Sequence, residues 1–283
     1  MNLHLLLFVT LAVVGILVLM ACGGGWASPY KDKRTDIHFG YYGSYQPTAN
    51  EAKDHTTFFW SVPAWTGLEQ AIEDVRIAGK PVVLDLEYAL FKPLPDGQKG
   101  WTFKDNPEGR LREMFQRMRE AGVLHMVKVL CPTDEPNLPE RNLDNYVPQA
   151  VEITKRVAEE FPELDGVKLG VIYYSRRPMQ HMGLFDIVGF DDYENGANIL
   201  QPERSYEQMR SQLRPDQKTW LIIGGSYGQD PEPFVKYAHA NMEVWGIVAF
   251  IGAVPPWETT FKGIFDLPEM REKYIQTGKS LLP

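Results

Sequence analysis

Carboxylate side chains follow three of the short apolar segments in this chain. The pairs are Asp85 and Glu87, Asp134 and Glu135, and Asp191 and Asp192. Paired carboxylates can carry out general acid–base chemistry, because burial keeps one acid protonated near neutral pH while its neighbour stays ionised. These residue types therefore indicate a site of proton transfer.

The segment from Pro81 to Tyr88 predicts a strand, along which side chains alternate between two faces. Asp85 and Glu87 then share one face, and Leu84 and Leu86 share the other. Leucines suit a face covered by helices, so we expect the two carboxylates to point inward and contact substrate. For Asp85, a buried structural acceptor is the alternative.

Eight short apolar strands, mostly separated by amphipathic helices, account for residues 36–283. We expect strands at residues 37–45, 56–62, 81–88, 124–131, 167–174, 185–190, 219–223 and 244–251. Helices are expected at residues 68–78, 107–121, 143–161 and 206–213, from residue 231, and near the end of the chain. This number and order predict a single (β/α)8 TIM barrel, whose active site lies at the carboxyl ends of the strands.

Two motifs at these strand ends resemble clan A glycoside hydrolases. Barrels of that clan place Asn-Glu-Pro after strand four, where this chain has Asp-Glu-Pro at residues 134–136. The resemblance implies that Glu135 is the general acid/base and that Asp134 accepts a hydrogen bond from a sugar hydroxyl. The segment 189–193, Gly-Phe-Asp-Asp-Tyr, resembles the strand-six pattern of the clan and implies that Asp191 and Tyr193 line the site.

Strand seven departs from the resemblance, because retaining members end it with a nucleophilic Glu and residues 222–228 here read Ile-Ile-Gly-Gly-Ser-Tyr-Gly. An inverting hydrolase with a more distant base, a substrate-assisted hydrolase that uses the acetamido group of an N-acetylated sugar, and a barrel that binds glycan without cutting it all stay open. The candidates for the second carboxylate are Asp85, Glu87, Asp191 and Asp192, and we place Asp191 and Asp192 with Glu135 in the catalytic set.

Aromatic side chains at the strand ends could stack against sugar rings. Tyr42 follows the first strand, and Trp257 follows the eighth. Trp257 resembles the strand-eight Trp that forms the floor of the sugar subsite in clan A, and Pro255-Pro256 would hold it rigidly. We expect Tyr42 and Trp257, together with Tyr193, to contact a carbohydrate.

Composition argues against several other classes of function. The net charge is −8 and no long basic run is present, so a nucleic acid partner is not expected. The six His residues are scattered, and the two cysteines, Cys22 and Cys131, form no Cys-x-x-Cys motif. We therefore expect neither a metal site nor a cofactor.

The amino-terminal segment predicts export. Leu5 to Ala21 is almost entirely apolar, and Leu19-Met20-Ala21-Cys22 resembles a bacterial lipobox. We expect residues 1–22 to be a lipoprotein signal with lipid on Cys22, and residues 23–35 to be a linker. The first four residues lack Lys and Arg, so an uncleaved membrane-spanning anchor is the alternative.

Either anchor places the barrel in the cell envelope, facing the periplasm or the exterior. The sequence thus predicts a membrane-anchored glycoside hydrolase-like protein that acts on a polysaccharide or glycan. A non-catalytic glycan-binding lipoprotein is the main alternative, and a scaffolding envelope protein is a third.

Overall fold

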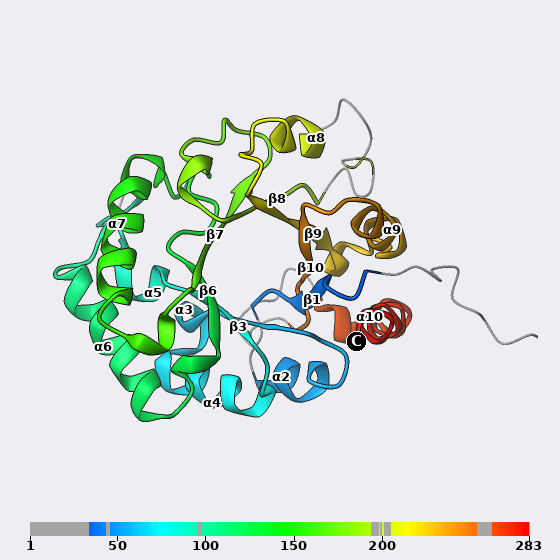
Figure 1. The fold of residues 1–283 in the computed structure, drawn as a ribbon, viewed down its shortest axis with the longest axis horizontal. Coiled ribbons are helices and arrows are strands. Elements are labelled where there is room, and N and C mark those ends of the chain that lie inside the picture. The colour runs from blue at the N-terminus through cyan, green and yellow to red at the C-terminus, as the bar shows by residue number, and fades with distance from the viewer. Residues whose placement is uncertain are drawn as a thin grey trace, which may run out of the picture. The chain divides into compact units, whose positions relative to one another are not determined.

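A ring of parallel strands forms the centre of the fold (Figure 1). The computed structural model describes residues 34–43, 46–95, 98–193, 198, 200, 205–253 and 262–282, and Thr35–Pro283 form one compact unit. The strands of the ring are β1 (His38–Tyr41), β2 (Phe59–Ser61), β3 (Val82–Asp85), β6 (Val127–Cys131), β7 (Lys168–Tyr174), β8 (Ile187–Asp191), β9 (Lys218–Gly224) and β10 (Val244–Phe250).

The eight strands pair in the order β1, β10, β9, β8, β7, β6, β3, β2, and every pairing is parallel. At the seam between β1 and β2 the backbone amide of Thr57 donates to the carbonyl of Phe39 over 2.8 Å. The barrel is therefore nearly closed. The predicted (β/α)8 TIM barrel is confirmed.

Helices surround the ring on its outer side (Figure 1). They are α2 (Gln46–Ala52), α3 (Pro63–Thr66), α4 (Leu68–Ala78), α5 (Glu87–Leu90), α6 (Pro107–Glu120), α7 (Val147–Ala158), α8 (Ser205–Arg210), α9 (Glu232–Ala240) and α10 (Pro268–Leu281). Helix α4 has the bounds that the sequence predicts: its buried residues recur at helical spacing, and Gly79 ends it in the left-handed conformation at φ 59°. None of the helices among the described residues is both long and apolar enough to cross a membrane.

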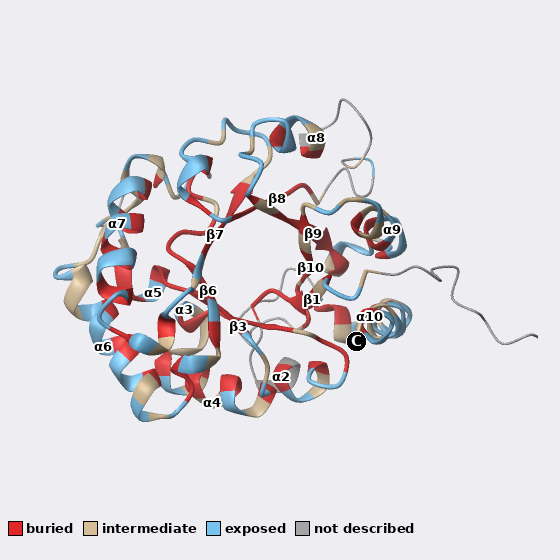
Figure 2. Cartoon of the chain, viewed as in Figure 1, coloured by how far each residue is buried: buried red, intermediate tan, exposed pale blue. Residues whose placement is uncertain are grey.

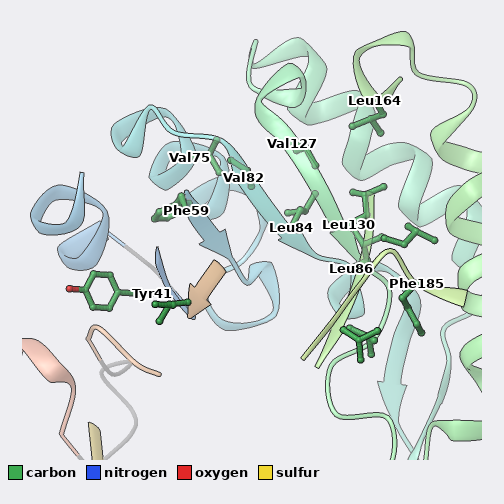
Figure 3. Packing of buried hydrophobic residues seen from close by; sticks show 14 of the residues in the cluster. Tyr41, Phe59, Val75, Val82, Leu84, Leu86, Val127, Leu130, Leu164 and Phe185 are labelled. Carbon is green, nitrogen blue, oxygen red and sulfur yellow. The ribbon is translucent and has the colours of Figure 1, made fainter. Parts of the chain in front are cut away.

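Two hydrophobic layers hold the barrel together, and Figure 2 shows the buried residues on the strands and on the inward faces of the helices. The outer layer lies between strands and helices; Leu84 and Leu86 belong to it, and Figure 3 shows them with Leu130. The inner layer fills the barrel and contains Val83 and Trp220. Because side chains alternate along β3, Asp85 lies on the inner side with Val83.

The strand expected at residues 81–88 is too long. Strand β3 ends at Asp85, whose carboxylate accepts a hydrogen bond of 2.9 Å from the amide of Glu87. Leu86 adopts helical dihedral angles (φ −104°, ψ −2°), so the chain turns and Glu87 begins α5. An Asp that binds the backbone two residues ahead favours such a turn, and alternation along a strand therefore does not reach Glu87.

A short antiparallel hairpin, β4 (Phe91–Pro93) with β5 (Trp101–Phe103), was not predicted. It is held by stacking of Phe91 on Phe103, whose ring centroids lie 4.8 Å apart. The amide of Trp101 donates to the carbonyl of Arg141 over 2.8 Å, so the hairpin also supports the loop that follows β6. That loop carries residues of the candidate site.

Packing inside the barrel gives a first test of the fold. A Cβ atom at Gly170 in β7 would lie 2.2 Å from the ring of Trp220 and 3.0 Å from Val129. We expect Gly170→Ala to lower the free energy of unfolding by about 1–3 kcal/mol, because the fully buried Trp220 has little space to move. Denaturant unfolding measures the change.

Gly183→Ala is the matched control, because a Cβ atom there would meet only a side-chain atom of Arg214, 3.8 Å away. Equal stability of the two variants would show that Trp220 does not pack against Gly170 as described here.

Candidate active site

A cavity of about 160 Å³ opens at the carboxyl ends of the strands, where barrel enzymes hold their active sites. We name it the central cavity. Its charged lining residues are Asp134, Glu135, Arg141 and Asp191, and its aromatic ones are Tyr42, Trp65, Tyr193 and Phe250. Seven of the residues that the sequence singled out therefore meet here or directly beneath, from strands distant in sequence: Tyr42, Asp85, Glu87, Asp134, Glu135, Asp191 and Tyr193.

The backbone holds Glu135 at the edge of β7. Its amide donates to the carbonyl of Ile172 over 2.9 Å, and the preceding Asp134 forms an isolated parallel bridge with Ile172. Glu135 has a φ of 44°, in the left-handed region that non-glycine residues rarely adopt. Asn137 binds both the amide and the carbonyl of Tyr174, over 2.9 and 2.8 Å, and so fixes the loop after the acid.

Glu135 and Asp191 form a carboxyl pair whose members have different proton affinities. Burial raises the pKa of Glu135 to about 9, and the charge of Asp191 and a hydrogen bond with it add to the rise. Burial also raises the pKa of Asp191, to about 6, while hydrogen bonds with Glu135 and Tyr193 act in the lowering direction. At neutral pH the shared proton therefore resides on Glu135, and Asp191 is ionised.

One carboxylate oxygen of Asp191 has unused hydrogen-bonding capacity. The residue is only 4% exposed, and its Oδ1 atom has no hydrogen-bond partner among the described residues. A buried carboxylate oxygen without a partner is costly, so such an atom at a cavity wall indicates a place where a bound molecule donates.

Arg141 supplies positive charge beneath the pair. Its Nη1 atom donates to both carboxylate oxygens of Glu87, over 2.7 and 2.8 Å, and to the carbonyl of Asp134 over 2.6 Å. Its Nη2 atom lies 3.6 Å from the Asp134 carboxylate. Because Glu87 and Asp134 are buried, they need a cation nearby, and Arg141 provides it.

Asp134 and Asp85 complete this inner cluster. Burial raises the pKa of Asp134 to about 7 despite Arg141, and the hydroxyl of Tyr42 donates to its Oδ2 atom over 2.7 Å. Burial, followed by the charges of Glu87 and Asp134, raises the pKa of Asp85 well above its usual range. Asp85 accepts a hydrogen bond from the amide of Glu87, as the structural alternative for this residue expects.

The remaining predicted residues lie elsewhere or outside the described residues. Asp192 is buried and lines a neighbouring cavity together with Glu135 and Asp191. Trp257 and Cys22 both fall outside the described residues. The stacking of a sugar on Trp257 and the attachment of a lipid to Cys22 therefore stay predictions. Phe250, the last residue of β10, lines the central cavity from that strand.

Arg141 was missed in the sequence. It stands in a loop with no regular pattern, six residues after Glu135, and reaches the cluster only because the loop folds back. The amides of Arg141 and Asn142 both donate to the carbonyl of Leu138, and that of Leu143 donates to the carbonyl of Pro136. The signal available was indirect: several acids expected at one end of a barrel require a cation among them.

A larger hollow of about 590 Å³ lies beside the loop from α7 to β7, at the amino ends of the strands. Its lining includes Lys155, Glu159 and Asp186 but none of the paired carboxylates. Because barrel chemistry takes place at the opposite end, we assign the site to the central cavity. Among the described residues, no three His, Cys, Asp or Glu side chains are grouped to hold a metal ion.

No protein-family model matches this chain, and no curated protein matches it in sequence. Solved structures resemble it at low identity. A β-D-glucuronidase of Dictyoglomus thermophilum is 13% identical with a TM-score of 0.50, over 87% of this chain and 50% of that enzyme. A fungal β-1,4-galactanase is 14% identical with a TM-score of 0.49, over 77% of this chain and 84% of that one.

A β-glucuronidase of Ruminococcus gnavus is 10% identical with a TM-score of 0.48, over 81% of this chain and 47% of that enzyme. The match spans 32% to 47% of the length of the β-glucuronidases from Parabacteroides merdae and Ruminococcus gnavus. At such identities the likeness concerns the fold. Together with the nearly closed ring of eight parallel strands, the likeness to the Dictyoglomus thermophilum enzyme shows that this chain has a TIM-barrel fold.

Proposed function

We propose that this protein hydrolyses a glycosidic bond in a glycan that contains N-acetylated sugars. One observation carries the proposal: Glu135 and Asp191 form a buried carboxyl pair, protonated on one member and ionised on the other, at the wall of the central cavity. A pair of carboxyl groups whose pKa values are driven apart is how glycosidases obtain an acid and an anion at the same pH.

In the proposed reaction Glu135 donates its proton to the glycosidic oxygen as the bond to the anomeric carbon breaks and the acetamido oxygen of the substrate forms a bond to that carbon. Water then displaces the acetamido oxygen and returns a proton to Glu135. Asp191 carries the negative charge that stabilises the positive charge developing on the sugar. Arg141 and Tyr42 hold Asp134 beneath the pair and thereby fix the charges around Glu135. The aromatic residues of the cavity provide apolar surface for a sugar ring.

The contact between the two carboxyl groups bears on the source of the nucleophile. An inverting pair leaves room for a water between carboxyl groups about 6.5–9.5 Å apart, and a direct hydrogen bond is shorter than that. A displacing group also approaches from the face opposite the leaving oxygen, whereas Asp191 lies beside the acid. Asp191 is therefore suited to orient a nucleophile that the substrate supplies, such as the acetamido group of an N-acetylated sugar.

The place of action follows from the leader. We propose that Cys22 carries a lipid and that the barrel acts on glycans of a bacterial cell envelope. Mass spectrometry of the protein purified from membranes tests this part, since a mature chain that begins at lipidated Cys22 has a defined mass.

Incubation of the full chain with a library of glycans, with product release and binding both measured, tests the function. We expect release of reducing ends from N-acetylated chains, and inhibition by a thiazoline analogue of the cyclised acetamido intermediate. No carboxylate stands at the end of β9, the seventh strand of the barrel, and this favours a second candidate, glycan binding without hydrolysis. Binding of an N-acetylated chain with no product released would select that candidate.

The pH dependence of kcat/KM is expected to be bell-shaped. Activity should rise as Asp191 ionises around its pKa of about 6 and fall as Glu135 loses its proton around its pKa of about 9. Because the two groups interact, the two apparent pKa values of the profile describe the pair and not the individual residues. Rates measured from pH 4 to pH 10 on one substrate provide the test.

Asp191→Asn is the informative variant for this profile. It removes the charge that helps to raise the pKa of Glu135, so the basic limb of the residual activity should move to lower pH. A basic limb that stays at the same pH would show that Asp191 does not raise the pKa of Glu135.

A further inference from the structure

A second cavity adjoins the central one across the carboxyl pair. It measures about 290 Å³, and Glu135, Asp191 and Tyr193 line both cavities. Its own lining includes Tyr174, Ser175, Asp192 and Tyr227. We name it the Tyr227 cavity. A ligand that extends from one cavity into the other must pass the two carboxyl groups.

Three aromatic rings run alongside this passage. The ring of Tyr193 stacks on that of Phe250, with centroids 5.0 Å apart and planes at 24°. The ring of Tyr227 stacks on Tyr193, with centroids 5.1 Å apart and planes at 10°. Phe250 belongs to the central cavity and Tyr227 to the neighbouring one, so the row of rings connects them.

Tyr227 is the most exposed of these three rings. Its exposed fraction is 55%, whereas Tyr193, on which it stacks, is of intermediate exposure. It ends the short turn Gly225–Tyr227 after β9, and the turn has little freedom: a Cβ atom at Gly225 would lie 2.3 Å from Ile264. An exposed ring on a fixed backbone provides a flat apolar surface at low entropic cost, which suits stacking with a sugar.

Two polar atoms of the same cavity have no partner among the described residues. They are Asp191 Oδ1, on a side chain 4% exposed, and Ser175 Oγ. A sugar hydroxyl both donates and accepts hydrogen bonds, so it can satisfy a carboxylate oxygen and a serine hydroxyl together. Stacking surface and unsatisfied polar atoms therefore belong to residues that line one cavity.

We propose that the Tyr227 cavity is a second sugar subsite, and that an N-acetylated oligosaccharide binds across both cavities with its scissile bond at the Glu135–Asp191 pair. This inference rests on the proposed function and adds to it a requirement for chain length. Tyr227 then acts as the stacking platform for the neighbouring sugar residue. It follows β9, the seventh strand of the barrel, after which retaining clan A hydrolases hold their nucleophilic Glu.

Calorimetric binding of N-acetylglucosamine, its dimer and its tetramer to the full chain tests the subsite, with Glu135→Gln as the background to prevent hydrolysis. We expect the dimer and tetramer to bind more tightly than the monomer. Tyr227→Ala should weaken tetramer binding roughly tenfold and leave monomer binding unchanged, because one stacking contact is lost. Tyr227→Trp should preserve the gain with length.

Tyr88→Ala is the control, since Tyr88 is another exposed tyrosine, 38% accessible, and lies on α5 outside both cavities. The melting temperature of each variant verifies that it is folded. Failure of all three sugars to bind, no gain with length, or a gain that survives in Tyr227→Ala would overturn the proposal.

Turnover separates this inference from the proposed function. If the wild-type chain binds the tetramer through Tyr227 but releases no product, hydrolysis fails and the subsite stands. If the tetramer is hydrolysed and Tyr227→Ala leaves its kcat/KM unchanged, hydrolysis stands and the subsite is wrong.

Discussion

Glu135→Gln is expected to lower the turnover of a glycan by about 10²–10⁴-fold while its affinity stays close to the wild-type value. Gln has nearly the same shape as protonated Glu and can still donate a hydrogen bond, but it has no proton to give to the leaving oxygen. Burial already keeps Glu135 neutral at pH 7, so the substitution does not change the charge of the resting site. Steady-state rates and calorimetric binding on the same substrate measure both effects.

Glu140→Gln is the matched control, because Glu140 lies in the same loop, is exposed, and lines neither cavity. It should leave both turnover and affinity unchanged. Wild-type turnover in Glu135→Gln would remove this residue from the mechanism. A loss of binding equal to the loss of turnover would point instead to a structural role.

Arg141→Met is expected to destabilise the fold by about 3 kcal/mol, because removal of one partner from a buried ion pair leaves the other charge unpaired. The side chain of Arg141 is 22% exposed and that of Glu87 only 7%, so solvent cannot replace the lost cation fully. For a domain of this size the melting temperature should fall by roughly 6–12 °C. Thermal unfolding near pH 8 measures the effect.

The same variant should be less impaired at pH 5 than at pH 8. Without Arg141, the folded-state pKa of Asp134, already raised to about 7, rises further above its unfolded value. A carboxyl group with a raised pKa takes up a proton on folding, so its penalty is small near the unfolded pKa and grows as the pH rises. A loss of stability independent of pH would contradict this assignment of charges.

Arg112→Met provides the comparison. Arg112 donates to both oxygens of Glu160 over 2.6 Å, but the side chains are 44% and 41% exposed. Solvent screens this pair, so the melting temperature should stay close to that of the wild type at either pH. The contrast isolates burial as the cause of the expected loss.

The strands and helices of this barrel could be predicted because their apolar periodicity is strong. Helix α4 has the predicted bounds, and β7 starts one residue after the predicted position and ends with it. Strand ends were harder, since Asp85 terminates β3 through a side-chain contact that no periodicity reveals. The hairpin of β4 and β5 depends on the stacking of Phe91 and Phe103, twelve residues apart.

The site could be predicted in part for the same reason. Glu135 and Asp191 are found together because both follow strands of a parallel barrel, whose carboxyl ends converge. Arg141 and Tyr227 lie in loops, and their positions depend on turns such as that from Glu135 to Leu143 and on contacts such as Gly225 with Ile264. Sequence spacing carries no information on those contacts.

Two locally unfavourable features coincide at Glu135: a left-handed backbone, which most side chains avoid, and a carboxyl group whose partial burial raises its pKa to about 9. Asn or Gly would fit the same position with less strain, and neither would titrate. A relative that binds its glycan without hydrolysing it could have either residue at this position, and its folded state would be more stable as a result. If the proposed function holds, Glu at this position in related chains is expected to accompany hydrolysis, and Asn or Gly to accompany glycan binding alone.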